Sequence, residues 1–489
     1  MQGQQDSQRA LFDTIDLELM IPQDHLLRRI DSKIDFDFIY EITERLYCAD
    51  NGRPSIDPVL FFRMQLISYL YGMKSDRELC REVHLNLAYR WFCRLKLTDS
   101  VPDHSSMTRI RDRFGEAAFA EIFDCLLRGW KKSGHIKGKR IIADASLVEA
   151  NASIDSLKER EDGDPNAREL KKYDQRYHDF REGKRDRRVA NQTHVSKTDP
   201  DATLVSRKNG PRKLSYKVHF TIDAGNRMVL DCYATTGSRH ECPVLPERVA
   251  HLREHLALPI EEVIADRGYG RGPTYSDLRS QGIRHYIPLH DPRTGRGKLT
   301  PSEFKYDRRN DRYRCPQGHY LYPYEKLEKG IIKRYRLTGG HCRTCPMRDR
   351  CLPDNVRHRA RYVYRGLHQD EIEAVRRRQT TKTFAMRLIE RKWKIEGIFG
   401  EAKVNHGLRR ARYRGLSKVQ IQFFMIAIAL NCKRAVLAAI RHLLRLLLLM
   451  IVRIENLTIP ITDSRQKLNT RLQRYRAGKI RSNRLDSAI

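Results

Sequence analysis

Residues 386–416 read M-R-L-I-E-R-K-W-K-I-E-G-I-F-G-E-A-K-V-N-H-G-L-R-R-A-R-Y-R-G-L. In a helix of 3.6 residues per turn, Lys392, Glu396, Phe399 and Lys403 return to one stripe, because spacings of three, four and seven bring side chains to the same side. Glu401 lies roughly 140° further round the helix, so the two acids cannot serve one site. The stretch therefore predicts a helix that presents Glu396 between two cations.

The segment after this helix is strongly basic, with no acid between residues 402 and 420; its cations are Arg409, Arg410, Arg412, Arg414 and Lys418. Such a density of positive charge suits a phosphate backbone. Taken alone, the helix also fits a solvated surface helix with ion pairs. Two further acids, Asp144 and Asp266, each follow an apolar run, so we expect both near the ends of buried strands. Three such acids in a basic chain are what a magnesium-dependent phosphoryl-transfer site needs.

Charge is the strongest compositional signal. The 489 residues include 94 Lys and Arg against 61 Asp and Glu, which gives a net charge of +33. Such a chain attracts polyanions, so nucleic acid is the first partner to consider and an anionic membrane surface the second. A hydrophobic fraction of 40% indicates a folded protein, and the length allows two to four domains. A basic composition also fits ribosomal or regulatory proteins.

The ends of the chain carry no export or membrane signal. The N-terminus, M-Q-G-Q-Q-D-S-Q-R, lacks an apolar core, and the apolar run at 443–452 is interrupted by Arg445 and too short to span a bilayer. We therefore expect a cytoplasmic protein and no membrane partner. Eleven cysteines without a signal peptide favour thiols over a disulfide framework.

Residues 1–135 are predicted to be a helical domain. Asp57 with Pro58 is a cap and first-turn proline, the apolar residues at 59–71 repeat at helical spacing, and S-D-R-E at 75–78 is a capping box. A third helix around 89–92 completes a trio that fits either a DNA-contacting helix-turn-helix or a structural bundle. Asp103 then caps a further helix, and another is expected at 117–130.

From residue 139 the pattern becomes that of an α/β domain. Apolar runs predict strands at 140–148, 214–223, 228–236, 261–266 and 285–289, with helices at 243–256 and 275–281. This order implies a mixed sheet in which the strands that carry Asp144 and Asp266 can lie side by side. A charged stretch at 156–213 interrupts the pattern, and we interpret it as a mobile or DNA-touching insertion.

A second insertion, at 291–380, contains four cysteines in two clusters. C-P-Q-G-H carries Cys315, and C-R-T-C-P-M-R-D-R-C carries Cys342, Cys345 and Cys351. Tetrahedral zinc takes four thiolates held by tight turns, so the spacing predicts one structural Zn²⁺. The alternative is four reduced thiols; His319 and His341 are possible substitute ligands. The remaining regions are the Glu396 helix with an apolar helix at 419–437, both within 381–440, and a basic tail at 441–489.

Several segments together resemble those of bacterial insertion-sequence transposases of the DDE class. They are A-D-A-S-L-V-E-A-N-A-S at 143–153, S-K-T-D-P-D-A at 196–202, Y-K-V-H at 216–219, A-D-R-G-Y-G at 265–270 and I-E-G-I-F-G-E-A-K-V-N-H-G-L-R-R-A-R-Y-R-G at 395–415, with the cysteine cluster between the last two. The resemblance covers nearly everything from residue 50 to residue 438. It implies a ribonuclease H-like catalytic domain formed by 136–290 and 381–440, behind a helical domain for DNA-end binding or dimerisation.

The resemblance also implies roles for single residues. Asp144 and Asp266 correspond to the two strand acids and Glu396 to the helical one, which together would hold two Mg²⁺ or Mn²⁺ ions. Lys403 matches the lysine of the family's Tyr-Arg-Glu-Lys signature, whereas the tyrosine slot holds Ile389 and the arginine slot Lys392. A lysine supplies charge but not the bidentate geometry of arginine.

The expected function is metal-dependent cleavage and transfer of DNA strands at the ends of an insertion sequence. Lys392, Lys403 and the arginines at 409–414 would bind DNA, at the element ends and at the target, in a synaptic homodimer. One alternative is a catalytically silent DNA-binding protein derived from a transposase. Another is a nuclease that hydrolyses DNA without strand transfer, which only product analysis would distinguish.

Overall fold

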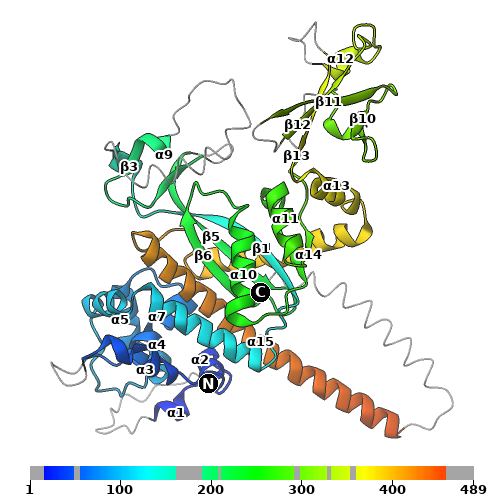
Figure 1. The fold of residues 1–489 in the computed structure, drawn as a ribbon. Coiled ribbons are helices and arrows are strands. Elements are labelled where there is room, and N and C mark those ends of the chain that lie inside the picture. The colour runs from blue at the N-terminus through cyan, green and yellow to red at the C-terminus, as the bar shows by residue number, and fades with distance from the viewer. Residues whose placement is uncertain are drawn as a thin grey trace, which may run out of the picture. The chain divides into compact units, whose positions relative to one another are not determined.

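A computed structural model of the chain describes residues 16–48, 55–160, 190–206, 211–290, 298–327, 332–352 and 360–458 (Figure 1). The chain forms two compact units. The first comprises Met1–Arg239, Leu252–Pro259 and Lys392–Ile489, and the second comprises His240–His251 and Ile260–Arg391. The boundaries near 392 and 252 fall inside two helices, α14 and α10.

The N-terminal part of the first unit is helical, as predicted. Its helices, with η for a short 3-10 helix, are α1 Leu17–Met20, α2 Leu26–Asp31, α3 Phe38–Thr43, η1 Glu44–Leu46, α4 Pro58–Leu70, α5 Asp76–Leu85, α6 Leu87–Phe92 and α7 His104–Lys132. Asp57 begins α4 by accepting the backbone N–H groups of Val59 and Leu60 at 2.6 and 3.0 Å, and Asp103 begins α7 in the same way. The two helices predicted at 103 and 117 meet at Gly115, whose φ of 62° interrupts α7.

Helix α6, the third member of the proposed helix-turn-helix trio, lies in the domain core. Four of its six side chains are buried, among them Trp91 at 8% and Phe92 at 0% exposure. A recognition helix needs an exposed face to enter the major groove. The burial of α6 therefore favours the structural-bundle interpretation of this trio.

The sheet of the first unit consists of long antiparallel strands. They are β1 Arg140–Glu149, β5 Lys213–Asp223 and β6 Val229–Thr236, and β5 pairs with both of the others. The hairpin predicted at 224–227 joins β5 to β6. The short strand β4 Thr203–Val205 pairs with the beginning of β5. The strand positions of β1, β5 and β6 are those predicted from the apolar runs.

The charged stretch at 156–213 is in part ordered. It contains η2 Ile154–Ser156, the antiparallel pair β2 Leu157–Glu159 and β3 His194–Ser196, and α9 Ala190–Thr193. The prediction of a mobile or DNA-touching insertion remains for residues 161–189 and 207–210, which lie outside the described residues.

The long helix α15 Leu416–Thr458 runs alongside β6 and α7 (Figure 1). Gln420 accepts the N–H of Ala234 at 2.6 Å and donates to the carbonyl of Cys232 at 2.8 Å. Asn431 bonds both backbone groups of Val229, at 2.7 and 2.8 Å. Because these two amides satisfy backbone groups on the outer edge of β6, α15 completes the sheet instead of leaving an open edge.

Helix α15 is also the one described helix that is long and apolar enough to cross a membrane. The stretch with this length and composition is Leu416–Ala438, and 78% of an 18-residue segment within it is buried inside the protein. Such burial is that of a core helix. The helix extends beyond its predicted end at 437 and through the first part of the predicted basic tail, to Thr458; the rest of that tail, 459–489, lies outside the described residues.

The second unit contains a parallel strand pair and a separate antiparallel sheet. The first group comprises α10 Val244–Leu256, β7 Glu262–Ile264, η3 Arg267–Tyr269, α11 Gly272–Ser280 and β8 Arg284–Tyr286, with β7 parallel to β8. The second comprises η4 Pro301–Glu303, β9 Lys305–Asp307, β10 Arg312–Arg314, β11 Tyr320–Leu327, β12 Ile332–Leu337, α12 Arg348–Cys351 and β13 Tyr362–Gly366. Helices α13 Gln369–Arg378 and α14 Lys382–Asn405 follow.

The order of elements along the chain identifies the fold class. Three antiparallel strands, β1, β5 and β6, are followed by helix, strand, helix and strand, and then, after the insertion, by α14. This is the succession of a ribonuclease H-like domain, so the predicted multidomain α/β class with a helical N-terminal domain is confirmed. The insertion at 291–380 is a five-stranded antiparallel sheet of order β13-β12-β11-β10-β9.

Candidate active site

Asp144 lies in the middle of β1, half-buried, with its Oδ1 accepting the N–H of Ala145 at 2.9 Å. Its partner across the antiparallel ladder is Phe220 of β5. Directly opposed residues of an antiparallel pair project from the same face of the sheet. The buried ring of Phe220 therefore marks the face that carries Asp144.

Helix α14 packs on this same face. The ring of Phe399 stacks on Phe220, with centroids 5.1 Å apart and planes 3° from parallel. Lys394 donates to the carbonyl of Ala224 in the β5–β6 hairpin. At Gly397 a Cβ would lie 2.7 Å from a guanidinium nitrogen of Arg227, so glycine permits the close approach. These contacts fix the helix over the strand next to Asp144.

Glu396 lies three residues before Phe399 and is exposed. Side chains three apart share a helix face, so the Phe220–Phe399 stack brings Glu396 and Asp144 to one face of the sheet. Among the residues that the structure describes, no ion-pair partner of Glu396 is found. Its charge is thus not neutralised within the fold.

Glu401 has a different role, as the helical spacing predicted. Lys433 and Arg434 of α15 contact its carboxylate at 2.8 and 2.7 Å, and His406 Nε2 lies 3.6 Å away. Burial works to raise the pKa of Glu401, but the contact with His406 and the charges of Arg434 and Lys433 outweigh it and hold the pKa far below its ordinary value. Glu401 joins two helices and is not available to a metal or to DNA.

The two predicted lysines of α14 differ in exposure. Lys392 is exposed, whereas Lys403 is half-buried with its Nζ 5.9 Å from the ring of Phe399. The two lysines thus lie on either side of Glu396, in the predicted stripe formed by Lys392, Glu396, Phe399 and Lys403.

The arginines after α14 lie at the carboxyl end of β1. Glu149, the last residue of β1, donates its N–H to the carbonyl of Arg409 at 3.1 Å and accepts the N–H of Ala411 at 2.7 Å. Arg409, Arg410 and Arg414 are exposed. The strand that carries Asp144 therefore ends beside three exposed cations, which suits the approach of a phosphate backbone.

Arg412, predicted with the other arginines to bind DNA, is instead turned into the protein. Its guanidinium lies 4.2 Å from the ring centroid of Tyr69 and donates to Ser68 Oγ at 3.0 Å. Its side chain joins the basic segment to α4. A phosphate-binding role for Arg412 stays a prediction, although these contacts give it a structural role in the fold.

Two acids that carried no role in the sequence analysis position this basic segment. Asp199 is fully buried, accepts the hydroxyl of Tyr216 and accepts the N–H of Gly415 at 3.1 Å. Asp201 accepts the N–H of Leu416 at 2.8 Å. Burial raises the pKa of Asp199. Asp199 and Tyr216 lie in two of the motifs that carried the resemblance, S-K-T-D-P-D-A and Y-K-V-H, but nothing in the sequence indicated that these motifs meet.

Asp266 belongs to the second unit, where it follows β7. Its Oδ1 accepts the N–H of Gly268 at 2.7 Å, which caps η3. A Cβ on Gly268 would lie 2.9 Å from Asp266 Oδ1 and 2.9 Å from Glu241 Oε2, so two carboxylates flank this glycine. The sequence analysis did not select Glu241. His240 beside it contacts Arg271 at 3.0 Å.

The donor atoms of Asp144, Asp266 and Glu396 suit magnesium. Carboxylate oxygens are the ligands that Mg²⁺ prefers, and the ion needs few of them because it keeps several waters. Across the described parts of the chain, no three His, Cys, Asp or Glu side chains stand close enough together to hold a metal ion as they are. The three side chains therefore fit magnesium by the chemistry of their donor atoms. Asp144 and Glu396 also lie on the same face of the sheet.

The four cysteines of the insertion line one small cavity of about 30 Å³. None of Cys315, Cys342, Cys345 and Cys351 is in a disulfide. Burial raises the pKa of the Cys351 thiol, the charge of Arg361 opposes this, and repulsion from the thiolates of the other three cysteines adds to the rise. His319 and His341 line the same cavity, with their rings stacked at 4.4 Å. These are the donor types that structural Zn²⁺ takes, but as they stand the side chains do not form a metal-binding group, so the zinc ion stays a prediction.

Replacing Cys345 with serine is expected to remove the zinc that the purified chain binds. Zinc binds thiolates, and a serine hydroxyl is a poor ligand for it, so the remaining three thiols hold the ion weakly. The measurement is metal content by inductively coupled plasma mass spectrometry. Cys80→Ser, outside the cavity, is the control and should retain the metal. Equal zinc in both variants, or none in the wild type, would favour the reduced-thiol alternative.

Two family models match the chain. "Transposase domain (DUF772)" matches residues 15–113, the helical N-terminal part, and "Transposase DDE domain" matches residues 314–436, which include the cysteine cluster and the Glu396 helix. None of the curated proteins matches.

Solved transposase structures give weak matches to the whole chain. The synaptic complex of piggyBac transposase with hairpin DNA matches with a TM-score of 0.31 and 11% identity, over 84% of this chain and 73% of that one. The Mos1 paired-end complex with the left transposon end matches with a TM-score of 0.15 and 10% identity, over 49% of this chain and 62% of that one. At TM-scores this low, no property of these proteins transfers to this chain.

The two matching domains are both domains of transposases, and the second contains the helix that carries Glu396. The order of strands and helices is that of the ribonuclease H-like class. The chain therefore contains a region that matches a transposase domain at 15–113 and a region that matches a DDE transposase domain at 314–436.

Proposed function

We propose that this transposase cleaves and rejoins DNA strands at the ends of an insertion sequence by magnesium-dependent phosphoryl transfer. The observation that carries the proposal is the stack of Phe399 on Phe220, which holds the helix of Glu396 over the sheet face of Asp144. Asp266 is the third acid by its resemblance to the family. A protein that only binds DNA gains nothing from three acids facing phosphates, since like charges repel.

The residues divide into acids that hold metal and cations that hold DNA. Asp144, Asp266 and Glu396 would bind the ions, and Mg²⁺ would supply activation of the attacking water or 3′-hydroxyl and stabilisation of the leaving oxygen. The exposed cations Lys392, Arg409, Arg410 and Arg414 would hold flanking phosphates by charge. Lys403, the signature lysine, would position the phosphate nearest to Glu396.

The proposal extends to partners and to place of action. Double-stranded DNA is the substrate, both at the element ends and at the target, because the net charge of +33 favours a polyanion. Two element ends have to meet for strand transfer, so a homodimer in the synaptic complex is the simplest assembly. Such an enzyme would act in the cytoplasm, on the nucleoid.

The test is incubation of the full chain with a labelled duplex that carries the inverted repeat flanking its reading frame, in Mg²⁺ or Mn²⁺. The expected products are strands cut at the repeat boundary and, with target DNA added, joined strands. Cut strands without joined ones would indicate a nuclease. Binding without any cutting would instead favour the alternative of a catalytically silent DNA-binding protein.

A further inference from the structure

The five-stranded sheet of the insertion has two unlike faces. One face is a hydrophobic core formed by Tyr313, Leu321, Tyr335 and Val363 and covered by Phe304, all less than 5% exposed. Neighbouring residues of each strand project from the opposite face. The second face therefore carries the residues that flank these core positions.

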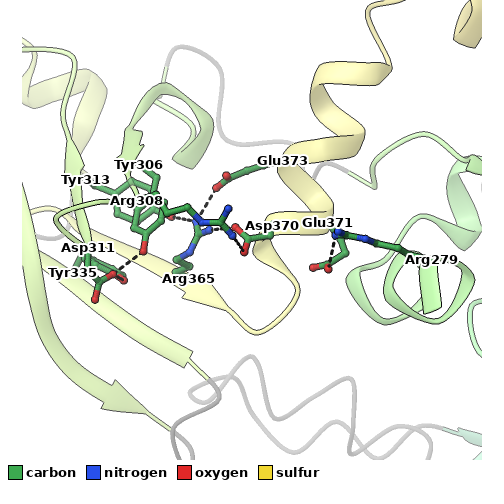
Figure 2. Close-up of polar contacts among 10 residues, drawn as sticks. All are labelled: Arg279, Tyr306, Arg308, Asp311, Tyr313, Tyr335, Arg365, Asp370, Glu371 and Glu373. Atoms are coloured by element: carbon green, nitrogen blue, oxygen red, sulfur yellow. Dashed lines mark hydrogen bonds and ion pairs between the residues drawn. The ribbon is translucent and has the colours of Figure 1, made fainter. Parts of the chain in front are cut away.

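The charged groups at the edge of the core face have hydrogen-bond and ion-pair partners within the protein. Figure 2 shows Asp311 among the tyrosines; it accepts the hydroxyls of Tyr306 and Tyr335 at 2.7 and 2.6 Å. Arg365 contacts Asp370 and Glu373 at the start of α13 (Figure 2). On this side of the sheet, Asp311 and Arg365 therefore have their partners within the protein.

The opposite face is open and consists largely of tyrosine and arginine. Tyr322, Tyr324 and Tyr364 are 44%, 56% and 51% exposed. Arg336 pairs across the strands with Tyr322 and Tyr362, and Arg334 pairs with Tyr364. We call this the tyrosine–arginine face, formed by Tyr322, Tyr324, Tyr362, Tyr364, Arg334 and Arg336.

Arginine and tyrosine contact one another throughout this face. The guanidinium carbon of Arg334 lies 5.1 Å from the ring centroid of Tyr362, and that of Arg336 lies 5.1 Å from that of Tyr324. These cation–π contacts hold the side chains in place before any ligand arrives. Beside the face, Asp307 is neutralised by Arg312 at 3.0 Å, and in the strand register Glu325 of β11 lies opposite Arg334. The surface thus combines preorganised aromatic rings with excess positive charge.

We propose that the tyrosine–arginine face binds DNA with unpaired bases, such as a single strand or an opened strand end. Exposed rings gain energy by stacking on base faces, which are accessible only where bases are unpaired, and the arginines match the phosphates by charge. The inference rests on the proposed function, because strand cleavage creates ends whose terminal pairs lack a stacking neighbour. It goes beyond that function by assigning the insertion a partner of its own.

The test measures binding of the full chain to a short oligothymidylate that contains the fluorescent base pyrrolocytosine, in buffer without added Mg²⁺ or Mn²⁺ so that no cleavage occurs. Wild type is expected to quench the fluorescence by stacking. The double variant Tyr322→Ala/Tyr364→Ala should lose the quenching and bind the single strand about tenfold or more weakly. Its affinity for a blunt duplex of the same length should barely change. Tyr322→Phe/Tyr364→Phe should behave as wild type, since the rings remain.

A matched control separates this face from general positive charge. Arg334→Gln/Arg336→Gln should weaken single-strand binding and flatten its dependence on salt. Arg308→Gln should do neither, because Arg308 pairs with Asp370 near the other side of the sheet (Figure 2). Circular dichroism checks that each variant is folded.

Two results would overturn the inference: unchanged single-strand binding in the folded double-alanine variant, or equal losses for single strand and duplex. Neither depends on catalysis. A wild type that quenches the probe but never cuts DNA would support the face and refute the proposed function. A wild type that cuts DNA but does not quench the probe would support the proposed function and refute the binding role of the tyrosine–arginine face.

Discussion

Replacing Glu396 with glutamine is expected to lower DNA-end cleavage by at least about a hundredfold to a thousandfold, the range seen when one charge-stabilising group is lost from an active site. Glutamine keeps the shape of the side chain but removes the negative charge that a divalent ion requires. Because Glu396 is exposed and has no ion-pair partner among the described residues, the fold should be unaffected. Binding to the duplex, measured in EDTA, should remain at the wild-type level.

The control for this prediction is Glu121→Gln. Glu121 is a half-buried helical glutamate whose side chain is 42% exposed, and it forms a surface pair with Arg45 at 2.6 Å. Its neutralisation should leave cleavage unchanged, because exposed pairs contribute little. Asp144→Asn should match Glu396→Gln, since both acids lie on the face marked by the Phe220–Phe399 stack. Full cleavage by Glu396→Gln would show that the third acid has been misassigned.

Replacing Glu401 with glutamine is expected to destabilise the first unit by about 3–5 kcal/mol, the cost of removing one partner from a buried charge network. Glu401 accepts from Lys433 and Arg434 of α15, and its side chain is only 24% exposed. The variant leaves both cations without their counter-charge inside the packing of α14 on α15. At a temperature where the variant is still folded, cleavage should persist, in contrast to Glu396→Gln.

Tryptophan fluorescence during urea denaturation measures this effect, because all three tryptophans, Trp91, Trp130 and Trp393, belong to the first unit. Glu121→Gln again serves as the control and should keep the wild-type midpoint. A Glu401→Gln midpoint equal to that of wild type would show that the network adds no stability. Loss of cleavage in a folded Glu401→Gln protein would instead give Glu401 the catalytic role.

The same network predicts a dependence of stability on pH. The pKa of Glu401 is lowered by folding from its ordinary value of 4.5, so folding favours the charged carboxylate. Its contribution is fully present above pH 4.5 and is lost as the pH falls towards the lowered pKa. The difference in urea midpoint between wild type and Glu401→Gln should therefore shrink when the denaturation is repeated below pH 4.5.

Several features of the site could be predicted because they depend on local geometry. The choice of Glu396 over Glu401 follows from the helical repeat, which is the same in any helix. The strand that holds Asp144 follows from an apolar run, and the start of α4 follows from Asp57 and Pro58, because a cap is formed by neighbours in the chain. The resemblance to DDE transposases, carried by short motifs in order, is confirmed by the two domain matches.

Other features could not be predicted, because they depend on which distant segments meet. Arg412 has the same charge as Arg410 and Arg414, yet it packs on Tyr69 while they stay exposed. Asp199 is a buried acceptor for Tyr216 only because residues 196–202 dock against the start of α15. In each case the role of a charge is set by its partners and its burial, and sequence spacing contains neither.

The sequence by itself determined the resemblance to transposases, most helices and strands of the α/β region, and the placement of Glu396 and Glu401 on different sides of one helix. All of these follow from periodicity, capping and motif spacing, which act over a few residues. Only the tertiary structure decided that Glu401 joins α14 to α15, that α6 is buried, and that one face of the insertion sheet is left to tyrosine and arginine. Burial and pairing are properties of the packed chain, because they depend on contacts between residues far apart in sequence.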